Sequence, residues 1–251
     1  MKIIKLIYIT VLLACWPSYA NAQLPSVAAL KSWFDNPHAI APWVYKTHNN
    51  QYRLIAQSKA LGGGHLWYHP DAEPCVVSVP HQFFDQYTLT ISSAIFENLC
   101  QVMVSNSHHR HSDQVDGQTM DLSTRASSLH HNAILAYQAR YPLAKIFQIH
   151  GSSKKKRNSP TGKNADFIVS QGAISTAAIQ QLSQCLRQIS SASYDYPRQI
   201  NELGGTKNVM HQLALTPGSF FHIEISRSMR LKLIENNQLM EQLTLCLRYA
   251  L

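Results

Sequence analysis

The sequence predicts an α/β protein with a mostly parallel or mixed central sheet and helices on both of its faces. Short apolar runs of strand type alternate with segments of helical spacing from residue 75 to the end of the chain, which is the pattern of such sheets. With 251 residues, of which 45% are hydrophobic and only 14% charged, the chain can fold around a core. Sheets of this class place their chemistry just past the carboxyl ends of the strands.

Each element is predicted from its own periodicity and its ends. Short strands are expected within 42–70, where VYKTH and YRLIAQS precede the glycine-rich GGGHLWYHP. Compact apolar runs predict further strands over 75–80, 101–107, 144–151, 165–172 and 219–226. Helical spacing predicts helices over 88–99, 126–142, 175–189 and 235–251, the second ended by Pro142. The polar, histidine-rich residues 108–125 predict a loop.

The first 22 residues predict a secretory signal rather than part of the fold. A charged start with Lys2 and Lys5 precedes the apolar stretch LIYITVLLACW, and the A-x-A pattern ANA places the cleavage after Ala22. The apolar stretch is shorter than the roughly 20 residues that a membrane span needs. An alternative takes LLAC as a lipoprotein box with Cys15 lipidated. We therefore expect a mature single domain of residues 23–251, without a transmembrane segment, in the periplasm or outside the cell.

Four cysteines remain after removal of the signal, and an even number in an exported chain permits two disulfides. Two of them, Cys185 and Cys246, each lie in a helix-like pattern near the C-terminus, so we single out this pair. The other two are Cys75 and Cys100. None of the four has a CxxC spacing, which argues against a zinc site made of thiolates.

The basic run KKKR, residues 154–157, concentrates part of the formal net charge of +8. A basic patch can attract nucleic acid, anionic membranes or acidic polymers. No aromatic residues interleave with the run, as they do in single-stranded nucleic-acid sites. We expect a solvated loop that steers acidic substrates, and no nucleic-acid partner.

Three predicted strands end in residues with useful chemistry: VSVP is followed by His81, FQI by His150 and FHI by Glu224. Asp85 follows His81 by four residues, so one tight turn can bring both to the same metal ion. Two imidazoles and a carboxylate leave the fourth position of a tetrahedral zinc open for water, as a catalytic zinc site requires. A further carboxylate must move protons, and Glu224 suits that role. Candidates for holding a substrate carboxylate are Arg110, Arg125, Arg227 and Arg230.

Two of these residues also have a structural interpretation, and the local sequence bears on the roles of the others. His81 is open to being a turn residue, and Asp85 to being an N-cap of the next helix. His150 precedes a glycine, which leaves room for a close approach. Glu224 lies in the apolar run FFHIEIS, where an unpaired carboxylate is costly to bury. His222 shares its face, because strand side chains alternate.

The order of four motifs resembles that of the zinc carboxypeptidase-like superfamily. PHQFFD follows a strand, DLSTRASSLHHN places an arginine ahead of a helix, a later strand ends in IHG, and the last strand carries HIEIS. The superfamily includes carboxypeptidases, amidohydrolases of the succinylglutamate desuccinylase and aspartoacylase type, poly-γ-glutamate hydrolases and, more loosely, N-formylglutamate amidohydrolases. The resemblance covers roughly residues 60–235.

This resemblance implies one zinc ion per chain, held by His81, Asp85 and His150, with Glu224 as general base and acid. It also implies that Arg125 polarises the scissile carbonyl or binds a substrate carboxylate. The superfamily motif is H-x-x-E, whereas here the carboxylate belongs to an aspartate one residue further away. Weaker substitutes for this ligand are Glu73 and Asp121.

From the residues and the resemblance together we expect an exported zinc-dependent hydrolase that cleaves an amide or peptide bond next to a carboxylate. Its substrate would be a small peptide or an acidic amide. The alternative is a non-catalytic periplasmic protein that binds a metal or an anion, with an inactive hydrolase-like core. The two differ at Glu224, because only catalysis requires it.

Overall fold

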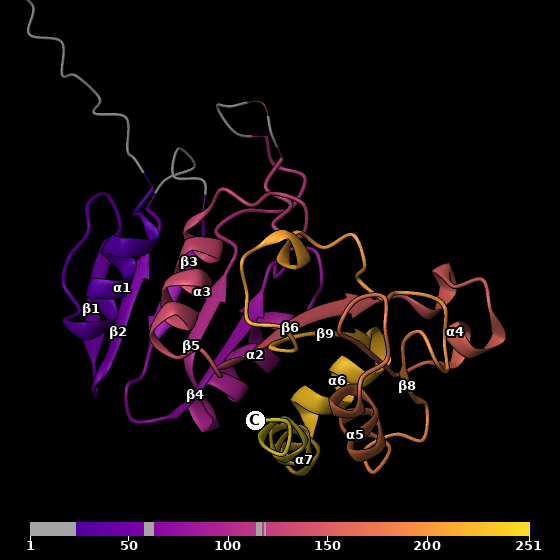
Figure 1. The fold of residues 1–251 in the computed structure, drawn as a ribbon. Coiled ribbons are helices and arrows are strands. Elements are labelled where there is room, and N and C mark those ends of the chain that lie inside the picture. Colours follow the sequence, from indigo (N-terminus) through magenta and orange to yellow (C-terminus); the bar gives the residue numbers. More distant parts are fainter. Residues whose placement is uncertain (1–23, 58–62, 114–116, 118) are drawn as a thin grey trace, which may run out of the picture.

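One mixed sheet of nine strands forms the centre of the computed structural model, which describes residues 24–57, 63–113, 117 and 119–251 (Figure 1). The strand order is β1-β2-β3-β5-β4-β6-β9-β7-β8. The central strands β5, β4, β6 and β9 run parallel, whereas β3 pairs antiparallel with β5 and β7 antiparallel with β9. The strands are β1 (Val44–His48), β2 (Gln51–Ile55), β3 (His65–Tyr68), β4 (Glu73–Val79), β5 (Cys100–Ser105), β6 (Lys145–Ser152), β7 (Phe167–Ser170), β8 (Ser193–Asp195) and β9 (Phe220–Ser226). The predicted α/β class is confirmed, and the predicted signal segment with Cys15 lies outside the described residues.

Helices cover both faces of the sheet (Figure 1). On one face α2, α5, α6 and α7 pack on a core that contains Phe147 and Phe221. On the other face α3 packs over β3 and β5 with α1 beside it, and Trp33, Phe34 and Tyr137 are buried there. The helices are α1 (Val27–Asp35), α2 (Thr88–Asn98), α3 (Leu129–Arg140), α4 (Pro160–Asn164), α5 (Ala177–Leu186), α6 (Arg227–Glu235) and α7 (Asn237–Arg248).

Capping residues set helix boundaries that periodicity alone does not locate. The side chain of Ser128 accepts the backbone N–H of His131, and that of Thr176 accepts the N–H of Ile179, so α3 and α5 begin slightly later than predicted. Four of these helices and strands were not predicted, namely α1, α4, α6 and β8. Helix α6 begins directly after β9 with Ser226 as its N-cap, and its sequence RSMRLKLIE is too charged to show a clear apolar stripe.

Two disulfides cross-link the fold. The pair Cys185–Cys246 joins α5 to α7, which confirms the pair singled out from the sequence, and Cys75–Cys100 joins β4 to the start of β5. Their Cα atoms lie 5.5 and 4.7 Å apart, within the range that a disulfide spans. Such bonds persist in oxidising, extracellular-type environments. In the part of the chain that the structure describes, every helix is too short or too polar to cross a membrane.

Candidate metal centre

The candidate site lies on the sheet face that α1 and α3 cover only in part. Strand alternation places Gln148 and His150 of β6 on this face, and the strand register pairs Gln148 with His222 and His150 with Glu224 of β9. A cavity of about 360 Å³ opens there, lined by His81, Arg110, Ser123, Thr124, His150, His222, Glu224 and residues 203–208.

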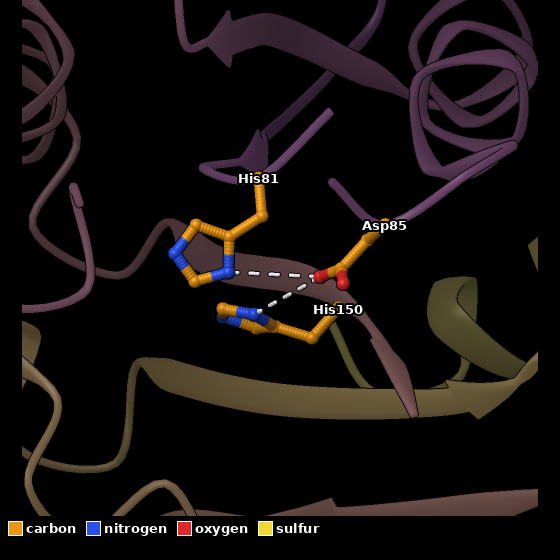
Figure 2. A group of neighbouring side chains, drawn as sticks. All are labelled: His81, Asp85 and His150. Atoms are coloured by element: carbon orange, nitrogen blue, oxygen red, sulfur yellow. Dashed lines mark ion pairs between the residues drawn. The ribbon is translucent and has the colours of Figure 1, made fainter. Parts of the chain in front are cut away.

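The carboxylate of Asp85 faces two imidazoles from one side (Figure 2). Its Oδ2 is 3.6 Å from Nδ1 of His81 and 3.8 Å from Nδ1 of His150, and the centroids of the two rings are 4.8 Å apart. All three side chains are buried. Gly151 permits this approach, because its N–H donates to Asp85 Oδ2 at 2.9 Å and a Cβ in its place would lie 2.9 Å from the Cβ of Asp85. The three side chains therefore direct their ligand atoms toward one another.

The turn between β4 and α2 brings His81 and Asp85 together. The backbone N–H of Asp85 donates to the carbonyl of His81 at 2.8 Å, and Thr88 Oγ1 donates to the carbonyl of Asp85 at 2.7 Å. The alternative role of Asp85 as a helix N-cap is wrong, because the N-cap of α2 is Tyr87, whose side chain makes no capping bond. The Asp85 carboxylate faces the imidazoles instead.

The outer nitrogens of both imidazoles are held by acceptors. Nε2 of His81 is 2.8 Å from Oδ1 of Asp121, and Nε2 of His150 is 2.9 Å from Oε1 of Gln148. Metal-binding histidines are usually held in this way, because the bond orients the ring and fixes which nitrogen is free to bind the metal. Asp121, a substitute ligand from the sequence, thus supports His81 from behind. Glu73 is exposed at the start of β4 and pairs with an arginine of α7 at 3.2 Å.

The charges in the site are set by these contacts. Burial alone raises the pKa of Asp85, but the neighbouring imidazoles of His150 and His81 and the hydrogen bond from the Gly151 N–H lower it well below its usual range. Burial lowers the pKa of His150. Burial also acts to lower the pKa of His81, but the carboxylates of Asp121 and Asp85 raise it above its usual value. An ionised carboxylate therefore faces two imidazoles, and this donor set suits zinc.

Glu224 and His222 form another part of the cavity wall. Oε1 of Glu224 is 3.7 Å from Nε2 of His222, whose ring centroid lies 4.6 Å from that of His150. Within the described residues, Oε2 of Glu224 and Nδ1 of His222 are buried without a hydrogen-bond partner. Burial, followed by the negative charge of Asp85, raises the pKa of Glu224 to about 8. His150, His222 and Glu224 thus form a second group able to hold a metal ion, which the sequence indicated only through the shared face of His222 and Glu224.

Among the described residues that line the cavity, Arg110 is the one arginine of the four predicted to bind substrate. Its Nη1 is 3.3 Å from Nδ1 of His81, and its Nη2 donates to Asp121. Its guanidinium carbon lies 5.3 Å from the centre of the Phe84 ring. The guanidinium is thereby oriented at the edge of the candidate metal centre.

The other three arginines make contacts outside the residues that line the cavity. Nε of Arg125 donates to the carbonyl of Ser127 at 3.2 Å. Arg227 and Arg230 both lie on α6 and donate to Gln86, the first to its side chain and the second, a buried residue, to its carbonyl. Sequence order did not reveal this placement, because α6 was not predicted and packs on the opposite face of the sheet.

The glycine-rich loop 203–208 forms one wall of the cavity. Gly205 has a φ of +59°, and a Cβ in its place would lie 2.7 Å from the ring of His222, so a glycine is required for this approach. Lys207 is exposed at the same wall. The basic run 154–157 does not line the cavity; it begins in a 3₁₀ turn, where Lys154 Nζ pairs with Asp166 at 2.7 Å.

Known proteins resemble this chain in fold rather than in sequence. No model of a known protein family and no curated protein matches the chain. Solved structures that match include an N-formylglutamate amidohydrolase from Ralstonia eutropha JMP134 (14% identity, TM-score 0.48, 76% of this chain and 95% of that one), a bacteriophage poly-γ-glutamate hydrolase (11%, 0.43, 90% and 94%) and a metallo-carboxypeptidase from Burkholderia cenocepacia (8%, 0.37, 89% and 67%). All three belong to enzyme kinds that the sequence resemblance names. At these identities and TM-scores they say nothing about what this chain binds or cleaves.

Proposed function

We propose that the protein is an exported zinc-dependent hydrolase that cleaves an amide or peptide bond next to a carboxylate. The observation that supports it most is the buried group of His81, Asp85 and His150. Both imidazoles in this group are held from behind, and their remaining nitrogens face one ionised carboxylate. Glu224 lines the same cavity.

The donor set fits a zinc ion. His81, Asp85 and His150 would hold it, and three protein ligands leave a coordination position for water or substrate. The cavity beside them is lined by Glu224 and His222, each of which has a buried polar atom without a partner among the described residues. When bound, zinc supplies a Lewis acid that polarises a carbonyl group and lowers the pKa of a water molecule to about 7.

Glu224 would move the protons. Its buried carboxyl group has a pKa raised to about 8, mainly by burial, so it exchanges protons near neutral pH. In the proposed reaction the carboxylate takes one proton from the attacking water and gives it to the nitrogen of the leaving amine as the C–N bond breaks. The water oxygen becomes part of the new carboxyl group.

Arg110 is the proposed anchor for the carboxylate of the substrate. A guanidinium presents a planar set of donors that matches a carboxylate, and Arg110 is already oriented by Asp121 and Phe84. Lys207 adds a second positive charge to the cavity wall. This arrangement supports a small peptide or an acidic amide as substrate.

Export to the periplasm or beyond is part of the proposal. It is supported by the signal-type sequence of residues 1–22 and by the two disulfides. Mass spectrometry of the mature N-terminus separates the two forms of export: a chain that begins at Gln23 is released, whereas one that begins at an acylated Cys15 is a lipoprotein.

The zinc content of the purified mature protein tests the proposal first. We expect about one zinc ion per chain in the wild type, none in His150→Ala, and an unchanged content in His48→Ala, which alters an exposed histidine on β1. His222→Ala separates the two donor groups, because it retains zinc if His81, Asp85 and His150 hold the ion.

A wild-type protein that carries no zinc and takes none up would end the proposal. Loss of zinc in His222→Ala would instead assign the ion to the group of His150, His222 and Glu224. Zinc binding without cleavage of any acidic amide or peptide in a substrate panel would leave the non-catalytic metal-binding protein as the function.

A further inference from the structure

A buried chain of hydrogen bonds runs from the backbone amide of Met210 to the ring of His150. We propose that this chain, with Gln148 as its central positioning residue, fixes the proton of His150 on Nε2 and leaves Nδ1 open toward Asp85 for a metal ion. The role in metal binding rests on the proposed function. The position of the hydrogen on the His150 ring depends only on the hydrogen bonds among these residues.

The backbone of Met210 sets the orientation of the first amide. A backbone N–H can only donate, and that of Met210 points to Oδ1 of Asn208 at 3.0 Å. The other end of the Asn208 side chain is therefore the NH₂ group, which donates to Oε1 of Gln148. The usual ambiguity between oxygen and nitrogen in a side-chain amide is removed by this contact.

The orientation passes from Gln148 to His150. Because Oε1 of Gln148 accepts from Asn208, the same oxygen faces Nε2 of His150 at 2.9 Å. An amide oxygen cannot donate, so Nε2 must carry the hydrogen. The NH₂ group of Gln148 donates in turn to Ser78 Oγ at 3.2 Å. Turning the Gln148 amide over would set two NH₂ groups against each other in a fully buried site, at a cost of about 1–3 kcal/mol per unsatisfied group.

The two imidazoles are thus held by different chemistry. His81 has a carboxylate behind Nε2, from Asp121, whereas His150 has a neutral amide. The environment explains the amide at the second position, because His150 already lies beside Asp85 and pairs across the strands with Glu224. A third carboxylate there would add a buried like charge. The hydrogen-bond chain also connects His150 to the cavity wall, because Asn208 belongs to the loop that lines the cavity.

The tautomer of His150 can be read directly in the metal-free wild-type protein. Long-range ¹H–¹⁵N correlation spectra at a pH where the ring is neutral report which ring nitrogen is protonated, and the His150→Ala spectrum identifies the signal. We expect the hydrogen on Nε2. A hydrogen on Nδ1 would overturn the inference, whatever the metal content of the protein.

Variants test the functional consequence. Gln148→Leu removes the acceptor and is expected to weaken zinc binding by about 10- to 100-fold, measured by competition with a chromophoric chelator. Gln148→Glu keeps an acceptor for both His150 and Asn208 and is expected to retain most of the zinc affinity, while its added buried charge should lower the thermal stability. The matched control is Gln101→Leu on β5, which changes another buried glutamine. The side chain of Gln101 accepts a hydrogen bond from the Tyr137 hydroxyl and donates one to the carbonyl of Pro70.

Gln101→Leu should lower the thermal stability and leave the zinc affinity unchanged. An unchanged zinc affinity in Gln148→Leu would overturn the positioning role while leaving the zinc centre in place. If the wild type binds no zinc, the proposed function fails, and the tautomer measurement still decides whether the hydrogen-bond chain works as inferred.

Discussion

The two ends of one sheet face differ sharply in chemistry. Near the start of the parallel strands, Val76 of β4 and Ile146 of β6 lie in the apolar core that α1 and α3 complete. Two residues further along the same strands, on the same face, stand Ser78 and Gln148, followed by His150. Strand alternation keeps all of these side chains on one side of the sheet. The apolar core therefore ends where α1 and α3 no longer cover this face of the sheet. Beyond that point, polar side chains face a cavity.

The energetics of the two ends differ as well. The apolar end is stabilised by burial of large side chains, at roughly 25 cal/mol per Å² of apolar surface removed from water. The polar end removes imidazoles, amides and carboxylates from water, which is tolerated only where hydrogen bonds replace those to water. Glu224 and His222 each retain an unpartnered buried atom in the part of the chain described. We therefore expect changes at the polar end to affect function more than stability, and the reverse at the apolar end.

Glu224→Gln is the change at the polar end with the largest expected effect. Removing the proton carrier should lower kcat by about 10²- to 10⁴-fold on an acidic amide substrate. Zinc content and thermal stability should remain close to those of the wild type, because glutamine has nearly the same shape and keeps an oxygen acceptor. The control is Glu97→Gln on the exposed side of α2. Activity that survives Glu224→Gln would remove the proposed role of this carboxylate.

Phe34→Ala tests the apolar end. The ring of Phe34 is buried on α1 and packs against Tyr68 and Tyr137 with centroids 5.1 and 5.2 Å away. Its loss should reduce the free energy of unfolding by about 3–5 kcal/mol, as measured by urea denaturation. Zinc affinity should not change. A variant that stays stable but loses zinc would contradict the separation of the two ends.

His131 links acid pH to stability at the first turn of α3. Burial lowers its pKa to about 4, and it is fully buried beside Ser128. The unfolded chain, with a pKa near 6.5, takes up the proton first as the pH falls. The contribution of neutral His131 to the free energy of unfolding is therefore complete above about pH 6.5 and is lost progressively toward pH 4. The loss is about 2 kcal/mol between pH 7 and pH 5.

Urea denaturation of the metal-free protein at these two pH values measures the effect. His131→Gln should lose less stability on acidification than the wild type, by about the same 2 kcal/mol. His48→Gln, in which an exposed histidine is changed, should behave like the wild type. An equal loss in wild type and His131→Gln would mean that other groups cause the acid sensitivity.

Local sequence patterns were enough to predict much of the fold and part of the candidate site. Compact apolar runs and helical spacing located the parallel core strands and four of the helices, because these local patterns reflect which faces are buried. The positions of His81, His150 and Glu224 at or near the ends of predicted strands followed from the same patterns. The pairing of Cys185 with Cys246 was indicated by two helices near the C-terminus.

Which of these residues come into contact depends on the long-range arrangement of the strands. Strand β9 lies between β6 and β7, and this non-sequential order sets His222 and Glu224 beside Gln148 and His150. It also left Arg230 outside the cavity lining, with its guanidinium beside Gly151 and donating to the carbonyls of Gln86 and Ile225. Local periodicity records on which side of an element a residue lies, but it does not record which element lies next to it. The neighbours of a buried polar group are set by long-range strand order and loop paths, and those exist only in the folded chain.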